Sequence, residues 1–158
     1  MKNLEFNVAV TGVPGTGKTT LCRELSLSGY RVIDLNEMAE KYGCTNNEEV
    51  SIDCMEKHMQ NIKGYLLDAH YSHLLNVYGV IIMECSPDIL MERLLSRGYN
   101  PSKIRENVDC LLSDSPWFES RDLYPETRIL RIRSEEWGIL NKAEEFIRRL
   151  EIKYNGTR

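Results

Sequence analysis

The stretch GVPGTGKT, residues 12–19, decides the fold of this chain. It matches the pattern G-x-x-x-x-G-K-[ST] at every position; the alternative is a glycine-rich turn followed by a chance lysine. The glycines let the backbone curl so that successive N–H groups point at one anion. The helix that follows adds the positive end of its dipole at the same point. The pattern therefore predicts a loop that holds the phosphates of a nucleoside triphosphate.

Each residue of this loop has an expected task. Lys18 can reach the β- and γ-phosphates, and the Thr19 hydroxyl can ligate Mg²⁺. The neighbouring sequence supports this interpretation, because an apolar run at 6–10 precedes the loop and residues 18–27 have helical spacing. The other expected ATP contacts come from the loop and the first helical turn: Gly12, Pro14, Gly15, Thr16, Gly17 and Thr20.

Short apolar runs alternate with segments of helical spacing along the rest of the chain. Strands are expected near residues 6–10, 31–33, 64–70, 78–85 and 128–132, with helices between them and after the last one. This alternation within 158 residues predicts one α/β domain with a parallel sheet covered on both faces. Residues 113–126 fit neither pattern, and we expect them to be mostly irregular.

Composition and charge exclude several classes of protein. The net charge of −4 argues against a nucleic-acid binder that acts through overall positive potential. No apolar run approaches the roughly 20 residues of a membrane span, and the N-terminus lacks the apolar core of a signal peptide. We therefore expect no membrane partner and a cytoplasmic location, or a nuclear one if the source is eukaryotic.

The chain has five cysteines, an odd number, and they are widely spread without a C-x-x-C pair. We interpret them as reduced cytosolic thiols that serve as small core residues and offer no metal template. These cysteines are Cys22, Cys44, Cys54, Cys85 and Cys110.

The stretch LLDAH, residues 66–70, provides a second candidate site. An aspartate at the carboxyl end of a strand beside a phosphate loop is placed to hold Mg²⁺, directly or through water. A turn-capping role is the alternative for Asp68. His70 lies two residues on and is expected on the same side of the strand, where it could orient a water molecule or the acceptor phosphate. A structural role for His70 stays open.

Arginines form the third candidate group. Arg93 and Arg97 are four residues apart on one expected helix, so they share a face. Phosphoryl transfer needs cations that arrive when the site closes, and Arg97 precedes a glycine that could begin a mobile segment. The alternative is a solvated basic face paired with Glu92 and Glu106. We prefer a catalytic role for Arg97.

Three of these motifs together resemble a known family. GVPGTGKTT, LLDAH and ERLLSRGYNPSKIRENVDCLL are similar to the adenylate kinases of the isoenzyme six branch, which includes the coilin-interacting nuclear ATPase proteins and archaeal relatives. The resemblance covers about residues 6–112. It implies a P-loop nucleoside monophosphate kinase fold with a five-stranded parallel sheet, in which an NMP-binding insertion spans about 31–54 and a short lid about 97–107.

The resemblance also implies an activity. Members transfer the γ-phosphate of ATP to AMP, giving two ADP, and show accompanying ATPase activity; eukaryotic members act in small ribosomal subunit maturation through a ribosomal protein. Arg93 and Arg97 would clamp the transferred phosphate. His70 and Asp34 would contact the acceptor nucleotide, although a helix N-cap suits Asp34 equally well. Adenine is expected near residues 134–137, where Trp137 either stacks on the base or, as we prefer, is half-buried in packing.

Other functions remain open. The chain could be an ATP-dependent assembly factor with vestigial kinase activity. A shikimate-type kinase is a third alternative, but those enzymes usually carry a Gly-Gly pair after the third strand, and DAHYSH has none. Ala69 and residues 113–126 depart from the family pattern, which leaves the acceptor less certain than the triphosphate.

Overall fold

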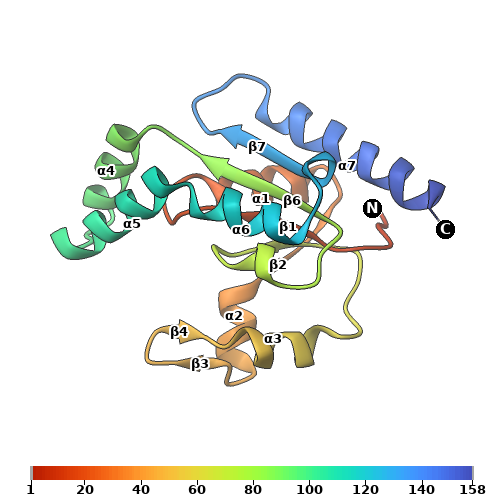
Figure 1. Cartoon of the computed structure of the whole chain (residues 1–158), viewed down its shortest axis with the longest axis horizontal. Helices are drawn as coiled ribbons and strands as arrows, with labels where there is room; N and C mark the ends of the chain where they lie inside the picture. Colours follow the sequence, from red (N-terminus) through yellow and green to blue (C-terminus); the bar gives the residue numbers. More distant parts are fainter. Residues whose placement is uncertain (1, 158) are drawn as a thin grey trace.

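Five parallel strands form the centre of the computed structural model, which describes residues 2–157 (Figure 1). β1 pairs with β5 on one side and with β6 on the other, and β2 and β7 complete the two edges. The five-stranded parallel sheet predicted from the family resemblance is confirmed. The strands, in spatial order, are β2 (Arg31–Asp34), β5 (Tyr65–Asp68), β1 (Val8–Thr11), β6 (Gly79–Glu84) and β7 (Ile129–Arg133).

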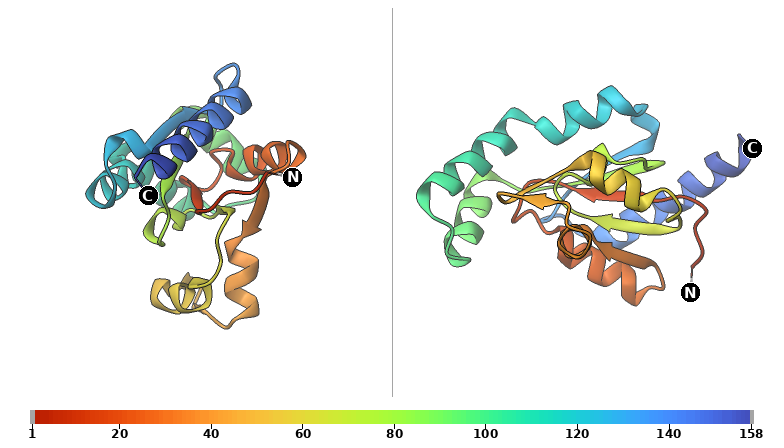
Figure 2. Two further views of the ribbon diagram at one scale, coloured as in Figure 1. Left: turned by 90° about the vertical axis from the view of Figure 1, so that its right-hand side faces the viewer. Right: turned by 90° about the horizontal axis from the view of Figure 1, so that it is seen from below.

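Helices cover both faces of the sheet, because parallel strands need crossover connections. On one face α1 (Lys18–Leu27) and α7 (Ile139–Gly156) pack against β1 and β6. The other face packs against the 3₁₀ turn η1 (Ser72–Leu74) and helix α6 (Ser115–Leu123), and apolar residues of α2 (Leu35–Lys41) and α3 (Ile52–Met59) extend the same cluster. A third apolar cluster joins the phosphate loop to α4 (Pro87–Ser96) and α5 (Pro101–Ser113), which stand at one end of the sheet (Figures 1 and 2).

A separate segment projects from the sheet between β2 and β5. It consists of α2, a short hairpin and α3, and both figures show it standing away from the strands. The hairpin pairs β3 (Thr45–Asn46) with β4 (Glu49–Val50). Its two turn residues, Asn47 and Glu48, have φ of 50° and 67°, as a two-residue turn with positive φ at both positions requires.

The expectation that residues 113–126 are mostly irregular is wrong. Helix α6 spans Ser115–Leu123, and the short 3₁₀ turn η2 spans Glu126–Arg128. A proline in the first turn suits the start of α6, and Pro116 and Ser120 are both buried, four residues apart on one face. The Arg131 guanidinium lies 4.8 Å from the Trp117 ring centroid and anchors the helix to β7. The contact with Arg131 joins residues that are distant in the sequence, so a local sequence pattern does not contain it.

The interpretation of all five cysteines as reduced thiols is also wrong. Cys44 and Cys54 form a disulfide, and the hairpin between them brings the two residues together. Cys22 and Cys85 are buried free thiols, which confirms the core role for these two.

Among residues 2–157, no helix has the length and apolar character needed to cross a membrane.

Candidate phosphoryl-transfer site

The phosphate loop leaves β1 and enters α1, as the sequence predicts. Gly12, Gly15 and Gly17 have φ of 136°, 93° and 104°, which side-chain-bearing residues rarely adopt. A Cβ added at Gly12 would lie 2.4 Å from the Met83 carbonyl oxygen, so the first turn of the loop accepts only glycine. Thr16 is fully buried, and its hydroxyl donates to the Val13 carbonyl at 2.7 Å, which closes the loop from within.

Lys18 bends back over this loop. Its Nζ donates to the carbonyl oxygens of Gly12 at 2.8 Å and Val13 at 3.2 Å. The pKa of Lys18 is lowered to about 8, mainly by burial; the Asp68 charge opposes the change and the Arg97 charge adds to it. Phosphate oxygens offer this ammonium a stronger partner than neutral carbonyls do, so the lysine is placed to bind a phosphate.

Thr19 and Asp68 lie in direct contact. The Thr19 hydroxyl, in the first turn of α1, donates to Asp68 Oδ2 at 3.0 Å. Burial raises the pKa of the Asp68 carboxyl, while the Thr19 hydrogen bond and the Lys18 charge act in the opposite direction. Mg²⁺ prefers oxygen ligands and often uses one or two carboxylates beside substrate phosphates, so this hydroxyl–carboxylate pair fits it.

One cavity of 340 Å³ gathers most of the predicted site residues. Asp34 caps α2, since its Oδ1 accepts hydrogen bonds from the backbone N–H groups of Asn36 and Glu37, and it also faces this cavity. His70 is exposed at the cavity, and desolvation followed by the Lys18 charge lowers its pKa. The cavity is lined by Pro14, Gly15, Gly17, Lys18, Thr19, Thr20, Asp34, Asn36, Asp68, Ala69, His70, Arg97 and Tyr99.

Only one of the two predicted clamp arginines lines the cavity that contains Lys18. Arg97 ends α4 and lines the cavity beside Lys18. Arg93 does not line that cavity, because its Nη1 donates to the Gly15 carbonyl and the Ser134 hydroxyl, both at 3.0 Å. Arg93 lines a neighbouring cavity of 340 Å³, which also contains Arg97 and Ser134. The structure therefore places Arg93 as a brace between the phosphate loop and the end of β7.

Trp137 is 94% exposed, so the half-buried packing role preferred from the sequence is wrong. It follows β7 in the loop that leads to α7. Ser134 of the same loop lines the cavity that contains Arg93.

Sequence reasoning gave little weight to His73, which connects α6 to the start of the phosphate loop. This histidine is 2% exposed. Its Nδ1 lies 2.7 Å from the hydroxyl of Thr11, the residue before Gly12, and its Nε2 lies 3.0 Å from Glu119 Oε1 on α6. Burial lowers the pKa of His73, and Glu119 opposes the change. No sequence pattern connects residues so far apart, and only the fold reveals this link.

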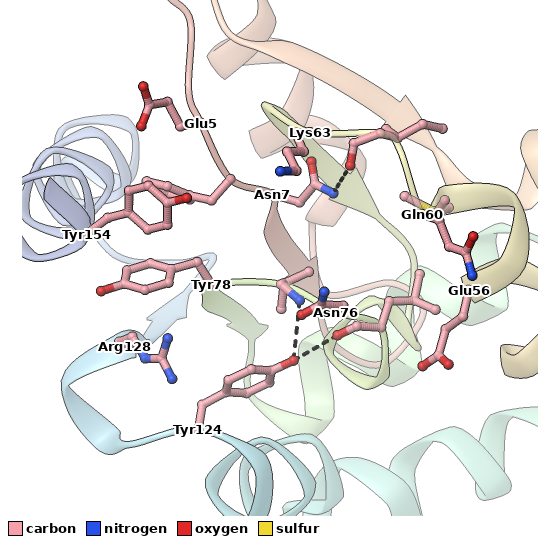
Figure 3. Close-up of a pocket in the computed structure, with 15 residues that line it drawn as sticks. Glu5, Asn7, Glu56, Gln60, Lys63, Asn76, Tyr78, Tyr124, Arg128 and Tyr154 are labelled. Carbon is pink, nitrogen blue, oxygen red and sulfur yellow. Dashed lines mark hydrogen bonds between the residues drawn. The ribbon is translucent and has the colours of Figure 1, made fainter. Parts of the chain in front are cut away.

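A larger cavity of 660 Å³ lies at the ends of the strands opposite to the phosphate loop (Figure 3). Asn7, Lys63, Tyr78 and Arg128 line it, and each closely precedes a strand, which places the cavity at the amino ends of the strands. The Arg128 guanidinium lies 4.5 Å from the Tyr78 ring centroid. Ligands of open α/β sheets bind outside the carboxyl ends of the strands, so size alone does not make this cavity the active site.

Comparison with known proteins agrees with this geometry. The family described as "AAA domain" matches residues 8–113, from β1 to the end of α5. A Thermoplasma acidophilum protein named "Putative adenylate kinase" is 42% identical over 134 residues, which cover 84% of this chain and 90% of that protein. A Methanocaldococcus jannaschii protein of the same name is 33% identical, covering 94% of this chain and 88% of that protein.

The chain belongs to the family of these archaeal proteins. The resemblance drawn from the three sequence motifs is therefore confirmed.

Solved structures share the fold at low sequence identity. A gluconokinase from Sinorhizobium meliloti 1021 matches with a TM-score of 0.63 at 15% identity, covering 99% of both chains. Shikimate kinase from Acinetobacter baumannii in complex with shikimate matches with a TM-score of 0.59 at 16% identity, covering 97% of this chain and 96% of that chain. These likenesses confirm a P-loop kinase fold.

Proposed function

We propose that this kinase transfers the γ-phosphate of ATP to AMP and releases two molecules of ADP. The observation that carries the proposal is a single cavity lined by Lys18, Thr19, Asp68, Asp34 and His70. The first three residues suit a triphosphate with its Mg²⁺, and Asp34 and His70 offer polar groups to an acceptor in the same cavity. The adenylate kinase name of the archaeal relatives supports AMP as that acceptor.

Positioning and charge neutralisation would supply most of the catalysis. The loop N–H groups and Lys18 hold the β- and γ-phosphates, and Arg97 reaches the transferred group from the end of α4. Thr19 and Asp68 would hold Mg²⁺, and the ion would supply positive charge to the phosphates of ATP. An in-line transfer between two bound nucleotides demands no protein general base, because the attacking phosphate oxygen of AMP is already ionised at neutral pH and needs only to be positioned.

The acceptor side would be formed by the segment that projects between β2 and β5. We propose that residues 31–54 bind the nucleoside monophosphate and that residues 97–107 close over the site as a lid. Asp34 and His70 would contact the acceptor. Arg97 and Gly98 mark the start of the proposed lid, and no Cβ added at Gly98 would meet another atom within 4 Å, which suits a hinge in open space.

A second activity is hydrolysis of ATP when no acceptor is bound. The family resemblance supports it, and it underlies the alternative that the chain is an assembly factor whose ATPase activity acts on a ribosomal protein or small-subunit precursor. We propose a cytoplasmic location for either role.

Acceptor preference tests the proposal. Purified protein is incubated with Mg-ATP alone and with AMP, CMP, UMP or GMP, and ADP formation is measured. We expect AMP to stimulate ADP formation strongly and the other monophosphates much less. Slow turnover that is indifferent to every monophosphate would overturn the kinase proposal in favour of the ATPase alternative.

Replacing Arg97 separates turnover from binding. We expect Arg97→Ala to lower kcat by roughly a hundredfold, because a preorganised cation at the transferred phosphate is lost, with a much smaller change in ATP affinity. Arg149→Ala, on the exposed face of α7, is the control and should change neither quantity. Equal losses of kcat and of ATP affinity would make Arg97 a ground-state binding residue instead.

A further inference from the structure

Cys44, Cys54 and His58 meet within the projecting segment, where α2 has ended and α3 begins, away from the phosphate loop. The two sulfur atoms and one ring nitrogen of His58 all lie within 4.8 Å of one another. Cys54 and His58 are four residues apart on α3 and so share one face of the helix. Cys44 approaches that face from the turn after α2. The spacing of the cysteines in the sequence does not predict a metal template, whereas the fold brings these three residues together.

The surrounding backbone holds all three residues in place. The Cys44 N–H donates to the Ala39 carbonyl at 2.8 Å, and the Ser51 N–H donates to the Cys44 carbonyl at 2.9 Å. The Ser51 hydroxyl accepts from the Cys54 N–H at 3.2 Å and caps α3. These bonds fix both cysteines on the backbone, independently of the bond between their sulfurs.

His58 is oriented by a neighbour. Its ring stacks on Tyr42, with ring centroids 4.3 Å apart and an interplanar angle of 16°. Cys44 is buried and Cys54 half-buried, whereas His58 is exposed. The cluster therefore has two sulfur donors on the inside and a nitrogen donor on the solvent side, so an ion can enter from solvent. A disulfide by itself makes no use of the histidine.

We propose that Cys44, Cys54 and His58 bind one Zn²⁺ ion when the disulfide is reduced. Two thiolates and one imidazole form a known zinc ligand set, with a water molecule completing the tetrahedron. Two ligands spaced i and i+4 on a helix are also a known zinc arrangement. With Zn–S bonds of about 2.3 Å, the two sulfurs of a tetrahedral site lie about 3.8 Å apart, so side-chain rotation of the reduced cysteines is sufficient.

Reduction of the Cys44–Cys54 disulfide requires a reductant, for which a dithiol is sufficient. Two electrons and two protons convert the disulfide to two thiols, and the dithiol is oxidised to its own disulfide. Zn²⁺ then displaces the two thiol protons, which pass to the buffer. The covalent bond and the metal are therefore alternative links between the end of α2 and the start of α3, within the segment proposed to bind the acceptor.

Metal titration tests the site without any measurement of kinase activity. Reduced protein, freed of the dithiol under argon, is titrated with Zn²⁺ against a chromogenic chelator, and in parallel with Co²⁺. We expect one ion per chain and the visible absorption of tetrahedral cobalt bound to thiolate. Protein with the disulfide intact should bind no ion at this site, because it offers no thiolate there.

Variants locate the ion. Cys54→Ser should abolish the cobalt absorption, and His58→Gln, at an exposed position, should weaken Zn²⁺ binding by at least about tenfold. Cys110→Ser removes a thiol elsewhere and is the matched control that should keep full binding. Absence of binding to the reduced wild-type chain would overturn the proposal. Undiminished binding in Cys54→Ser or in His58→Gln would overturn it as well.

Discussion

Lys18→Ala is expected to leave a folded protein that turns over ATP at least about a hundredfold more slowly. Lys18 is the cation nearest the loop carbonyls, and its ammonium would exchange those carbonyls for the β- and γ-phosphates. The fold should persist, because Lys18 is not a member of the apolar clusters that form the core. Steady-state ADP formation and the thermal unfolding midpoint are the two measurements.

Lys63→Ala is the control for this variant. Lys63 is exposed near the amino ends of the strands, far from the phosphate loop. Its replacement removes one positive charge and leaves the phosphate loop unchanged. We expect wild-type turnover in Lys63→Ala. Wild-type turnover in Lys18→Ala would instead remove the loop from the catalytic site.

The Asp68→Asn substitution is expected to have the second large effect on turnover. We expect kcat to fall by about a hundredfold and the Mg²⁺ concentration that gives half-maximal activity to rise, because an amide carries no charge for the cation. The Thr19 hydroxyl can still donate to the amide oxygen, so the local geometry should remain. The measurement is turnover as a function of free Mg²⁺.

Stability provides an independent readout on the same variant. Burial raises the pKa of Asp68, so the charged carboxylate is less favourable in the folded chain than in the unfolded one at neutral pH. A neutral amide removes that cost, and we expect a thermal midpoint no lower than that of the wild type.

Asp122→Asn, on the exposed side of α6, is the control and should keep both activity and Mg²⁺ dependence. An unchanged Mg²⁺ dependence in Asp68→Asn would remove Asp68 from the site.

The parts of the site that follow from the sequence are those whose chemistry is local. The phosphate loop needs glycines, Lys18 and Thr19 within eight consecutive positions, and the structure shows that backbone. Asp68 was predicted from its place at the end of a buried strand beside that loop, and the parallel register of β1 and β5 brings it to Thr19. Local chemistry and sheet topology are sufficient in both cases.

The parts that did not follow depend on contacts between distant segments. Arg93 and Arg97 share a helix face, yet Gly15 and Ser134 hold one of them outside the cavity that contains Lys18. His73 is held by hydrogen bonds with Thr11 and Glu119, which lie far from it along the chain. Trp137 is 94% exposed, although its large aromatic side chain favours packing. Periodicity and spacing contain none of this information.

The sequence pattern does not predict the disulfide, for a related reason. Cys44 and Cys54 are ten residues apart, and a polar stretch with no recognised structure separated them. The two-residue turn at Asn47 and Glu48 folds that stretch into a hairpin and brings the cysteines together. Glutamate is rare at positive φ, so the sequence did not signal this turn.

The fate of the terminal phosphate tests the central proposal most directly. Protein is incubated with Mg-ATP labelled in the γ-phosphate and with unlabelled AMP, and the labelled products are separated. We predict that the label appears in ADP formed from AMP, with little in free phosphate. Label that accumulates only in inorganic phosphate, whether or not AMP is present, would contradict the proposal that AMP is the acceptor.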